Sequence, residues 1–255
     1  MDRRIELTVT NSAVPEASTE ALSRQVAADD FCFVPAERLR ACLEAQAGDA
    51  LDDWSQFQSS WNDMPRDAYM ADGGIYRRRR HATLSALASS RHASLEPHQQ
   101  HYQSRNYNVL NGGIARYYEP IPQNIVLGPT MSSILSLCCD VFGQLLSDTA
   151  WHIELHQFRI EANTAEQGRP TPEGNHRDGV TFVLVMLVQR TNVASGTTTI
   201  YDLRERALAS FTLAQPFDAA IVNDERCLHG VTPVVQLDPG RTAYRDVLVV
   251  TFRKQ

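Results

Sequence analysis

A mainly β, α+β fold, with a double-sheet jelly roll behind a helical N-terminal part, is predicted by three observations. Residues 151–255 contain many short apolar segments at regular spacing. Turn-forming stretches such as Asn192–Gly196 and Asp238–Gly240 separate these segments. Before residue 150, by contrast, several apolar patterns have helical spacing. Many short strands in sequence are typical of a jelly roll.

The N-terminal part is predicted to be helical after a short arm. Apolar and polar residues alternate in residues 1–14, which favours a short strand or an arm. Residues 18–47 have helical spacing, with cap chemistry beginning at Ser18 and with Pro35 early in a second helix. Gly48 is a plausible end for that second helix.

The next hundred residues mix weak and clear signals. Residues 51–66 show little periodicity and support no assignment. The pairs Gly73-Gly74 and Gly112-Gly113 resemble turns that lead into short strands. Residues 129–146 have apolar side chains at helical spacing, which predicts a helix packed against the sheet.

The jelly-roll strands are predicted after Trp151, where the pattern changes from helical to β. We expect one domain over residues 1–255, with residues 1–150 as a buttress of helices, loops and short strands, and residues 151–255 as the catalytic core. The predicted strands are residues 151–162, 181–189, 197–203, 219–223, 230–235 and 247–252.

Composition narrows the classes of function. The chain has 255 residues, 43% hydrophobic and 21% charged, with a net charge of -6. An acidic protein is a poor general partner for nucleic acid or an anionic membrane, so we expect neither. Five cysteines without paired spacing indicate a reducing compartment, and the polar N-terminus lacks a signal peptide. We therefore expect a cytoplasmic protein.

The triplet His176-Arg177-Asp178 is the strongest candidate for chemistry. In an extended segment, His176 and Asp178 point to the same face. A later strand carrying His229 can return to the same end of a jelly roll. Two imidazoles and one carboxylate form the facial triad of non-haem Fe(II) oxygenases. Without His229 and the strands between, a surface loop is the commoner interpretation of the triplet.

Arg245 is the candidate for an anion site beside this triad. It lies at the entry to the apolar terminal strand, where an unpaired charge is costly. A guanidinium there would bind the distal carboxylate of 2-oxoglutarate through two parallel hydrogen bonds. The alternatives are Arg241, which follows a turn, and a structural ion pair of Arg245 with Asp246 or Asp224.

An oxygenase acting on a small carboxylate needs a second cation besides Arg245. The candidate substrate residues are Arg77, Arg79, Arg116, Arg159 and Gln157. Alternation places Gln157 and Arg159 on one face of their strand and His156 on the other. The run Arg77–Arg80 is alternatively a solvated face or a docking patch.

Four further histidines show no ligand pattern, and we interpret them as polar surface or loop residues. They are His81, His92, His98 and His101.

Several sequence words resemble the Fe(II)/2-oxoglutarate-dependent dioxygenases grouped with bacterial L-isoleucine 4-hydroxylase and related hydroxylases of free amino acids. The resemblance covers roughly residues 100–253. The words that carry it are Leu155–Arg159, His176–Asp178, His229–Pro233, Tyr244–Phe252, and the upstream Tyr102–Asn108 with Gly112-Gly113.

The resemblance implies a double-stranded β-helix, the cupin-like form of the jelly roll. It implies that His176, Asp178 and His229 bind Fe(II) and that Arg245 anchors 2-oxoglutarate. The implied reaction consumes O2 and hydroxylates a free, aliphatic L-amino acid or similar small carboxylate, with succinate and CO2 as co-products.

Two other functions compete with this interpretation. One is a 2-oxoglutarate oxygenase acting on a protein or nucleic-acid side group. The other is a non-catalytic jelly-roll module that binds a ligand. Whatever the function, the sequence is compatible with a homodimer.

Overall fold

The computed structural model of the chain describes residues 16–87 and 90–255; the expected arm over residues 1–14 lies outside them. The helices are α1 (Thr19–Asp29), α2 (Ala36–Glu44), α3 (Trp54–Ser59), α4 (Gln123–Val126) and α5 (Pro129–Leu145). The strands before residue 150 are β1 (Phe31–Val34), β2 (Arg77–Ala86), β3 (Ser94–Leu95), β4 (His101–Tyr102), β5 (Ala115–Arg116) and β6 (Glu119–Pro120).

Nine more strands follow, and they confirm the predicted change to β structure after Trp151. They are β7 (Trp151–Ala162), β8 (Phe182–Thr191), β9 (Val193–Ser195), β10 (Thr197–Asp202), β11 (Ala207–Thr212), β12 (Ala219–Asn223), β13 (Cys227–Val231), β14 (Val234–Gln236) and β15 (Ala243–Lys254).

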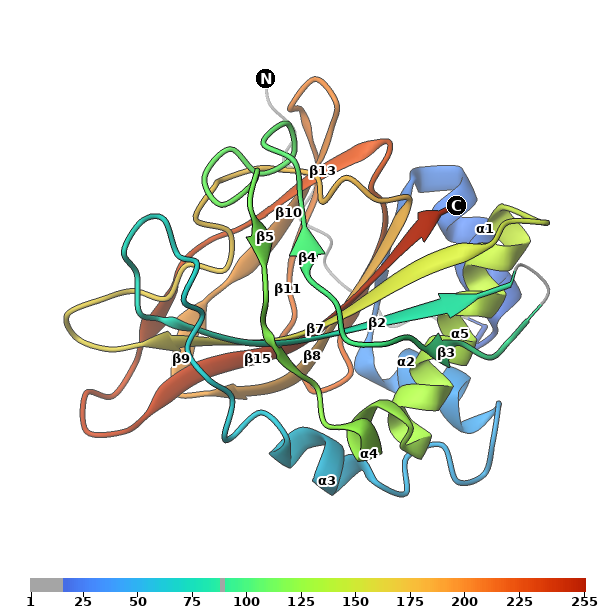
Figure 1. The fold of residues 1–255 in the computed structure, drawn as a ribbon, viewed down its shortest axis with the longest axis horizontal. Coiled ribbons are helices and arrows are strands. Elements are labelled where there is room, and N and C mark those ends of the chain that lie inside the picture. The colour runs from blue at the N-terminus through green and yellow to red at the C-terminus, as the bar shows by residue number, and fades with distance from the viewer. Residues whose placement is uncertain (1–15, 88–89) are drawn as a thin grey trace.

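A large sheet forms the body of the molecule, in the strand order β1-β12-β8-β15-β7-β2-β3, with β6 added beside β2 (Figure 1). Its long central strands are antiparallel, and β15 pairs with β7 along its whole length, from Ala243 opposite Ala162 to Lys254 opposite Trp151. A second sheet, in the order β11-β10-β13, lies over one face of the large sheet. The two sheets confirm the predicted jelly roll.

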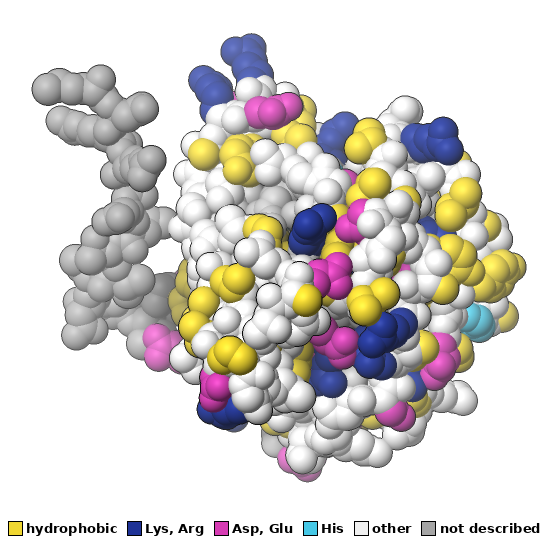
Figure 2. Space-filling model, turned by 90° about the vertical axis from the view of Figure 1, so that its left-hand side faces the viewer, with side chains coloured by type: hydrophobic (Ala, Val, Ile, Leu, Met, Phe, Trp, Pro, Cys, Tyr) yellow, Lys and Arg dark blue, Asp and Glu magenta, His cyan; other side chains and the backbone are white. Residues whose placement is uncertain are grey.

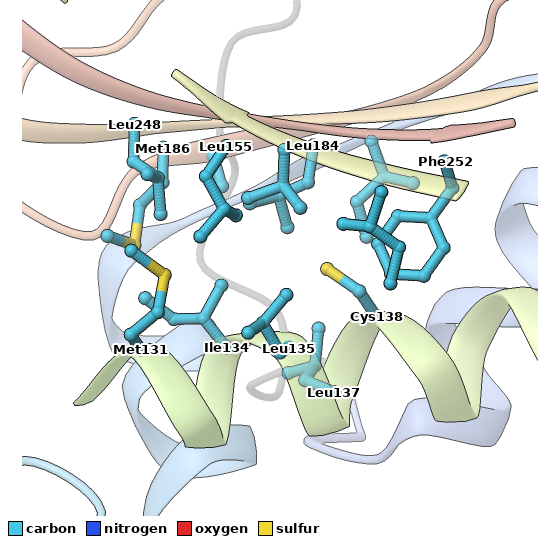
Figure 3. Packing of buried hydrophobic residues seen from close by; sticks show 14 of the residues in the cluster. Met131, Ile134, Leu135, Leu137, Cys138, Leu155, Leu184, Met186, Leu248 and Phe252 are labelled. Carbon is cyan, nitrogen blue, oxygen red and sulfur yellow. The ribbon is translucent and has the colours of Figure 1, made fainter. Parts of the chain in front are cut away.

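Helices cover one face of the large sheet, as the sequence predicts (Figure 1). Apolar side chains on α5, among them Ile134 and Leu135, meet the sheet residues Leu155, Leu184 and Leu248 (Figure 3). Alternation along a strand sends every second residue to the opposite face. Even-numbered residues of β7 and odd-numbered residues of β15 therefore line a cavity between the two sheets.

Local signals determine where the helices begin and end. Ser18 caps α1, because its hydroxyl accepts the backbone N–H of Ala21 at 3.1 Å. Asp30 ends α1 in the left-handed conformation, at φ 65°. Pro35 immediately precedes α2, and Pro129 opens α5 at its first position, where a missing N–H costs nothing. No described helix is both long and apolar enough to cross a membrane.

Several strands were not predicted at their full extent, among them β1, β2 and β11, and the predicted strand 230–235 is divided between β13 and β14. β1 lies between two helices as a four-residue strand, too short to show alternation, and pairs with β12. β2 is ten residues long and runs inside the sheet beside β7, although it begins with four arginines. β11 has no fully buried residue, so it lacks the apolar pattern of a buried strand.

Candidate metal centre and its cavity

His176 and His229 are held side by side by backbone pairing. Each residue donates its N–H to the carbonyl of the other, at 3.0 and 2.9 Å, in an isolated antiparallel bridge. Residues paired in this way project their side chains to the same face, and the two imidazole rings lie 4.4 Å apart. Asp178 follows two residues after His176 and faces the same space, as its spacing predicts.

The donor atoms of these three residues fit one divalent metal ion. His176 Nε2 lies 3.4 Å from Asp178 Oδ1, and His229 Nε2 lies 3.8 Å from Asp178 Oδ2. His176 Nδ1 lies 3.2 Å from the carbonyl oxygen of Gly174, which can only accept a hydrogen bond. The proton therefore sits on Nδ1, and Nε2 offers its lone pair to the metal. Two imidazoles and a carboxylate suit Fe(II) and leave positions open for other ligands.

Asp224 holds the loop that carries Asp178. Its carboxylate accepts the backbone N–H groups of Asp178, Gly179 and Val180 at 2.8, 2.8 and 3.0 Å. Gly179 adopts φ 82°, and a Cβ there would lie 2.4 Å from the ring of Tyr107, so only glycine fits. Burial and the nearby charge of Asp178 raise the pKa of Asp224 to about 7.

Metal affinity is expected to rise with pH. Burial alone lowers the pKa of His176, but the hydrogen bond and charge of Asp178 raise it to about 9, so below that pH a metal must displace its proton. His229, whose pKa burial lowers to about 4, is already neutral. Between pH about 6 and 9, affinity for Ni(II) measured by calorimetry should increase about tenfold per unit. The exposed-residue variant His92→Ala should keep this slope, and a flat profile would contradict the expectation.

Arg245 lies in the same cavity as the triad and has no acidic partner among the described residues. It is 2% exposed, and its Nε and Nη2 atoms make no hydrogen bond. Burial, and then the charge of Arg190, lower its pKa to about 10. Neither acid considered from the sequence pairs with it, because Asp246 contacts Arg159 and Asp224 contacts backbone N–H groups. Arg241, the other candidate, is exposed. Arg245 therefore presents a free guanidinium to an anion in the cavity.

The cavity has a volume of about 490 Å³, within the range of small-molecule sites. Three predicted substrate residues line it: Arg77, Arg79 and Arg116.

The three arginines in the cavity differ in what they contact. Arg77 pairs with Asp67 at 2.8 Å, and Arg79 donates to the Tyr118 hydroxyl at 2.9 Å. Arg116 is 1% exposed, and within the described part of the chain its guanidinium donates one hydrogen bond, to the side-chain oxygen of Gln103 at 3.5 Å, while its Nε has no partner. Arg116 thus resembles Arg245 as a buried cation without a carboxylate.

The predicted places of Arg159 and Gln157 in the substrate pocket are wrong. Alternation does put them on one face of β7 with His156 on the other, but the face of His156 lines the cavity. Arg159 instead binds Asp246 through two hydrogen bonds of 2.8 and 2.7 Å. Gln157 is fully buried and donates to the Ser60 hydroxyl at 2.8 Å.

The Arg159–Asp246 pair gives a stability prediction. Asp246→Ala leaves the Arg159 guanidinium, 9% exposed, without its partner, which should cost about 3–5 kcal/mol of unfolding free energy in urea titrations. Glu16→Ala removes an exposed partner of Arg24 and should cost less than about 1 kcal/mol. Equal losses in the two variants would contradict the buried-pair interpretation.

The run Arg77–Arg80 is not a docking patch. Arg77, Arg79 and Arg80 are each 5% exposed, and Arg80 pairs with Asp63 and Glu119 at 3.2 and 2.8 Å. On the face drawn in Figure 2, the described basic side chains are interspersed with acidic ones rather than forming a continuous basic stripe.

His81 and His101 do not lie on the surface, so this prediction was wrong for both; His92 and His98 are exposed. His81 is fully buried, and His101 Nδ1 lies 2.9 Å from Glu154 Oε2. His152 and His156 also face this carboxylate, at 3.7 and 3.6 Å. Burial alone raises the pKa of Glu154, but hydrogen bonds from the histidines, His101 foremost, hold that pKa well below its usual range.

This histidine cluster resembles a second metal site, but the protonation of His156 argues against it. Arg79 Nη2 lies 2.9 Å from His156 Nδ1. Because a guanidinium only donates, Nδ1 accepts and the ring proton sits on Nε2. Nε2 is the atom that faces Glu154, so it has no lone pair for a metal there. The cluster is best described as a hydrogen-bonded network around a buried carboxylate.

Gln103 and Glu173 are among the cavity residues that were not found from the sequence. Gln103 donates to the backbone carbonyl of Asp178 at 3.0 Å and so links Arg116 to the triad. Glu173 lies with Oε1 3.4 Å from His176 Nε2. The position of Glu173, three residues before His176, could have indicated from the sequence that it lies near the metal centre. Gln103 is brought to the site only by the fold.

A jelly roll with two imidazoles, a carboxylate and buried unpaired arginines around one cavity defines a non-haem iron oxygenase. Comparison with known families agrees, because the model of the 2OG-Fe dioxygenase family matches residues 58–251. The chain belongs to the 2OG-Fe dioxygenase family, and it is a dioxygenase that uses Fe(II), 2-oxoglutarate and O2.

Similar proteins cover nearly the whole chain. The 3(1)-hydroxy-L-isoleucine 4-dioxygenase of Pantoea ananatis is 24% identical over 91% of this chain and 94% of its own length. The L-isoleucine-4-hydroxylase of Bacillus thuringiensis is 26% identical over 78% of this chain and 82% of its own. A bsmA homolog from Methylobium petroleophilum PM1 superposes with a TM-score of 0.82 at 33% identity, covering 94% of both chains.

Proposed function

We propose that the protein hydroxylates a free, aliphatic L-amino acid, with conversion of 2-oxoglutarate to succinate and CO2. The observation that carries this proposal is the pair of buried cations in one cavity, Arg245 and Arg116, neither of which has a carboxylate partner among the described residues. A 2-oxoglutarate oxygenase needs one such group for its co-substrate. The second is available for the carboxylate of a small substrate.

His176, Asp178 and His229 would hold Fe(II), which when bound supplies the activation of O2. Arg245 would receive the distal carboxylate of 2-oxoglutarate, since a guanidinium binds a carboxylate through two parallel hydrogen bonds. Gly174 and Asp224 would maintain the orientation of the ligands through His176 Nδ1 and the backbone around Asp178.

Arg116 would bind the α-carboxylate of the substrate. It approaches the triad through Gln103, whose amide also contacts the carbonyl of Asp178. The rest of the cavity includes apolar walls, among them Val183, Val185 and Val249, which suit an aliphatic side chain. The two similar proteins named for isoleucine hydroxylation support a free amino acid as the substrate class.

A panel of the twenty amino acids, assayed for stimulated succinate formation, tests this proposal. We expect one amino acid or a few aliphatic ones to stimulate succinate formation, and the stimulation to require Fe(II). Arg116→Met should remove the stimulation and retain 2-oxoglutarate binding. A panel in which no amino acid stimulates turnover would contradict the proposal.

A further inference from the structure

Three carboxylates line the cavity: Glu154, Glu173 and Asp178. Asp178 belongs to the candidate metal centre. Glu154 is surrounded by four histidines and accepts a hydrogen bond from His101. Glu173 differs from both, because its Oε2 atom is buried and has no partner within residues 16–87 and 90–255. It is the cavity carboxylate with an unused oxygen.

The position of Glu173 is fixed by the backbone around it. Gly174 donates its N–H to the carbonyl of Thr171 at 3.0 Å and closes a turn about Glu173. The Thr171 side chain in turn exchanges hydrogen bonds with the backbone of Val231, at 3.3 and 3.0 Å, two residues after His229. The Glu173 side chain is 7% exposed. A buried carboxylate oxygen without a donor is costly unless a cation or a donor arrives.

Glu173 and Arg116 adjoin the metal centre through different residues. Glu173 lies 3.4 Å from His176, whereas Arg116 reaches the centre through Gln103 and the carbonyl of Asp178. Arg77 is neutralised by Asp67, and Arg245 is needed for 2-oxoglutarate. Arg79 also lacks a carboxylate, but its guanidinium already donates to the Tyr118 hydroxyl and contacts His156 Nδ1. Among the described buried arginines of the cavity, Arg116 is therefore the cation left for a substrate, and together with the unpaired Glu173 oxygen it matches a zwitterion.

From this geometry, and resting on the proposed function, we propose that Glu173 binds the α-ammonium group of the substrate while Arg116 binds its α-carboxylate. The site then selects α-amino acids over carboxylic acids of the same shape. A ligand without the ammonium group leaves the Glu173 carboxylate buried and unpaired, which a site built for pairing penalises strongly. Glu173 is thus the residue that restricts the substrate class from small carboxylates to amino acids.

The test compares the most active amino acid of the panel with the acid that lacks only its α-amino group. For L-isoleucine this analogue is 3-methylpentanoate. We expect wild type to prefer the amino acid by roughly 30-fold or more in kcat/KM, since an unpaired buried charge costs about 2–5 kcal/mol. Glu173→Gln should reduce this preference to below about tenfold, through weaker amino-acid binding rather than stronger use of the analogue.

A binding measurement separates recognition from damage to the metal centre. Calorimetric titration of the amino acid into the Ni(II) and 2-oxoglutarate complex should show a dissociation constant raised at least about tenfold in Glu173→Gln, with 2-oxoglutarate binding retained. Glu173→Asp, which keeps the charge but shortens the reach, should keep part of the preference. Glu225→Gln, an exposed control, should keep all of it.

Three outcomes would overturn the inference. An unchanged preference in Glu173→Gln would show that its carboxylate does not contact the ammonium group. An equal loss for both ligands would indicate a merely structural role. Loss of the preference in Glu154→Gln instead would place the ammonium group at the histidine cluster. All three outcomes are measured in variants and are compatible with amino-acid hydroxylation by wild type. None of them would contradict the proposed function itself.

Discussion

Asp178→Ala should lose both metal binding and 2-oxoglutarate turnover. Wild type is expected to bind one equivalent of divalent metal per chain, through His176, Asp178 and His229. Loss of an outer-shell partner of a metal ligand typically costs 10–100-fold in affinity, so loss of a direct ligand should exceed about 100-fold. Metal content after dialysis and succinate formation measure the two effects.

Asp52→Ala is the matched control, because Asp52 is an exposed aspartate outside the cavity. It should keep the metal and the activity of wild type. Full turnover in Asp178→Ala would refute the assignment of the metal centre. Retention of one tightly bound metal by this variant would instead place that ion at the Glu154 histidine cluster.

Arg245→Met should abolish saturation by 2-oxoglutarate while the metal stays bound. The substitution removes a buried guanidinium from an apolar strand and replaces it with an unbranched, uncharged side chain. Truncating one partner of a buried charge pair costs about 2–5 kcal/mol, which corresponds to a dissociation constant raised about 30- to 4,000-fold. Titration of 2-oxoglutarate into the Ni(II) protein measures this constant directly.

Arg241→Met tests whether the loss of 2-oxoglutarate binding is specific to Arg245. Arg241 is an exposed arginine four residues before Arg245. The variant should bind 2-oxoglutarate as wild type does. A second comparison uses 2-oxovalerate, which lacks the distal carboxylate: wild type should strongly prefer 2-oxoglutarate, and Arg245→Met should bind the two about equally. If Arg245→Met still prefers 2-oxoglutarate, another cation such as Arg190 must hold the distal carboxylate.

Most of the strands after Trp151 could be predicted because their apolar residues alternate or run together between clear turns. β1 and β2 could not be predicted at their true extent, for different reasons. The four residues of β1 are too few to show an alternating pattern, and the arginines of β2 resemble a surface segment. Their burial becomes possible only through partners distant in sequence, such as Glu119 for Arg80 and Asp67 for Arg77.

Most of the metal centre could be predicted from spacing, because His176 and Asp178 are separated by one residue in an extended segment. Arg159 and Gln157 show the limit of the same reasoning. Alternation shows which residues share a face, but the helices covering the sheet decide which face is left for the cavity. The role of Glu173 likewise depends on the absence of a partner, which only the folded structure reveals.

Coupling of the two half-reactions tests the proposed hydroxylase most directly. With the preferred amino acid, 2-oxoglutarate and isotopically labelled O2, we expect one succinate for each hydroxylated amino acid, and the label in both products by mass spectrometry. Succinate formation that no amino acid stimulates, or a hydroxyl group without the label from O2, would contradict the proposal.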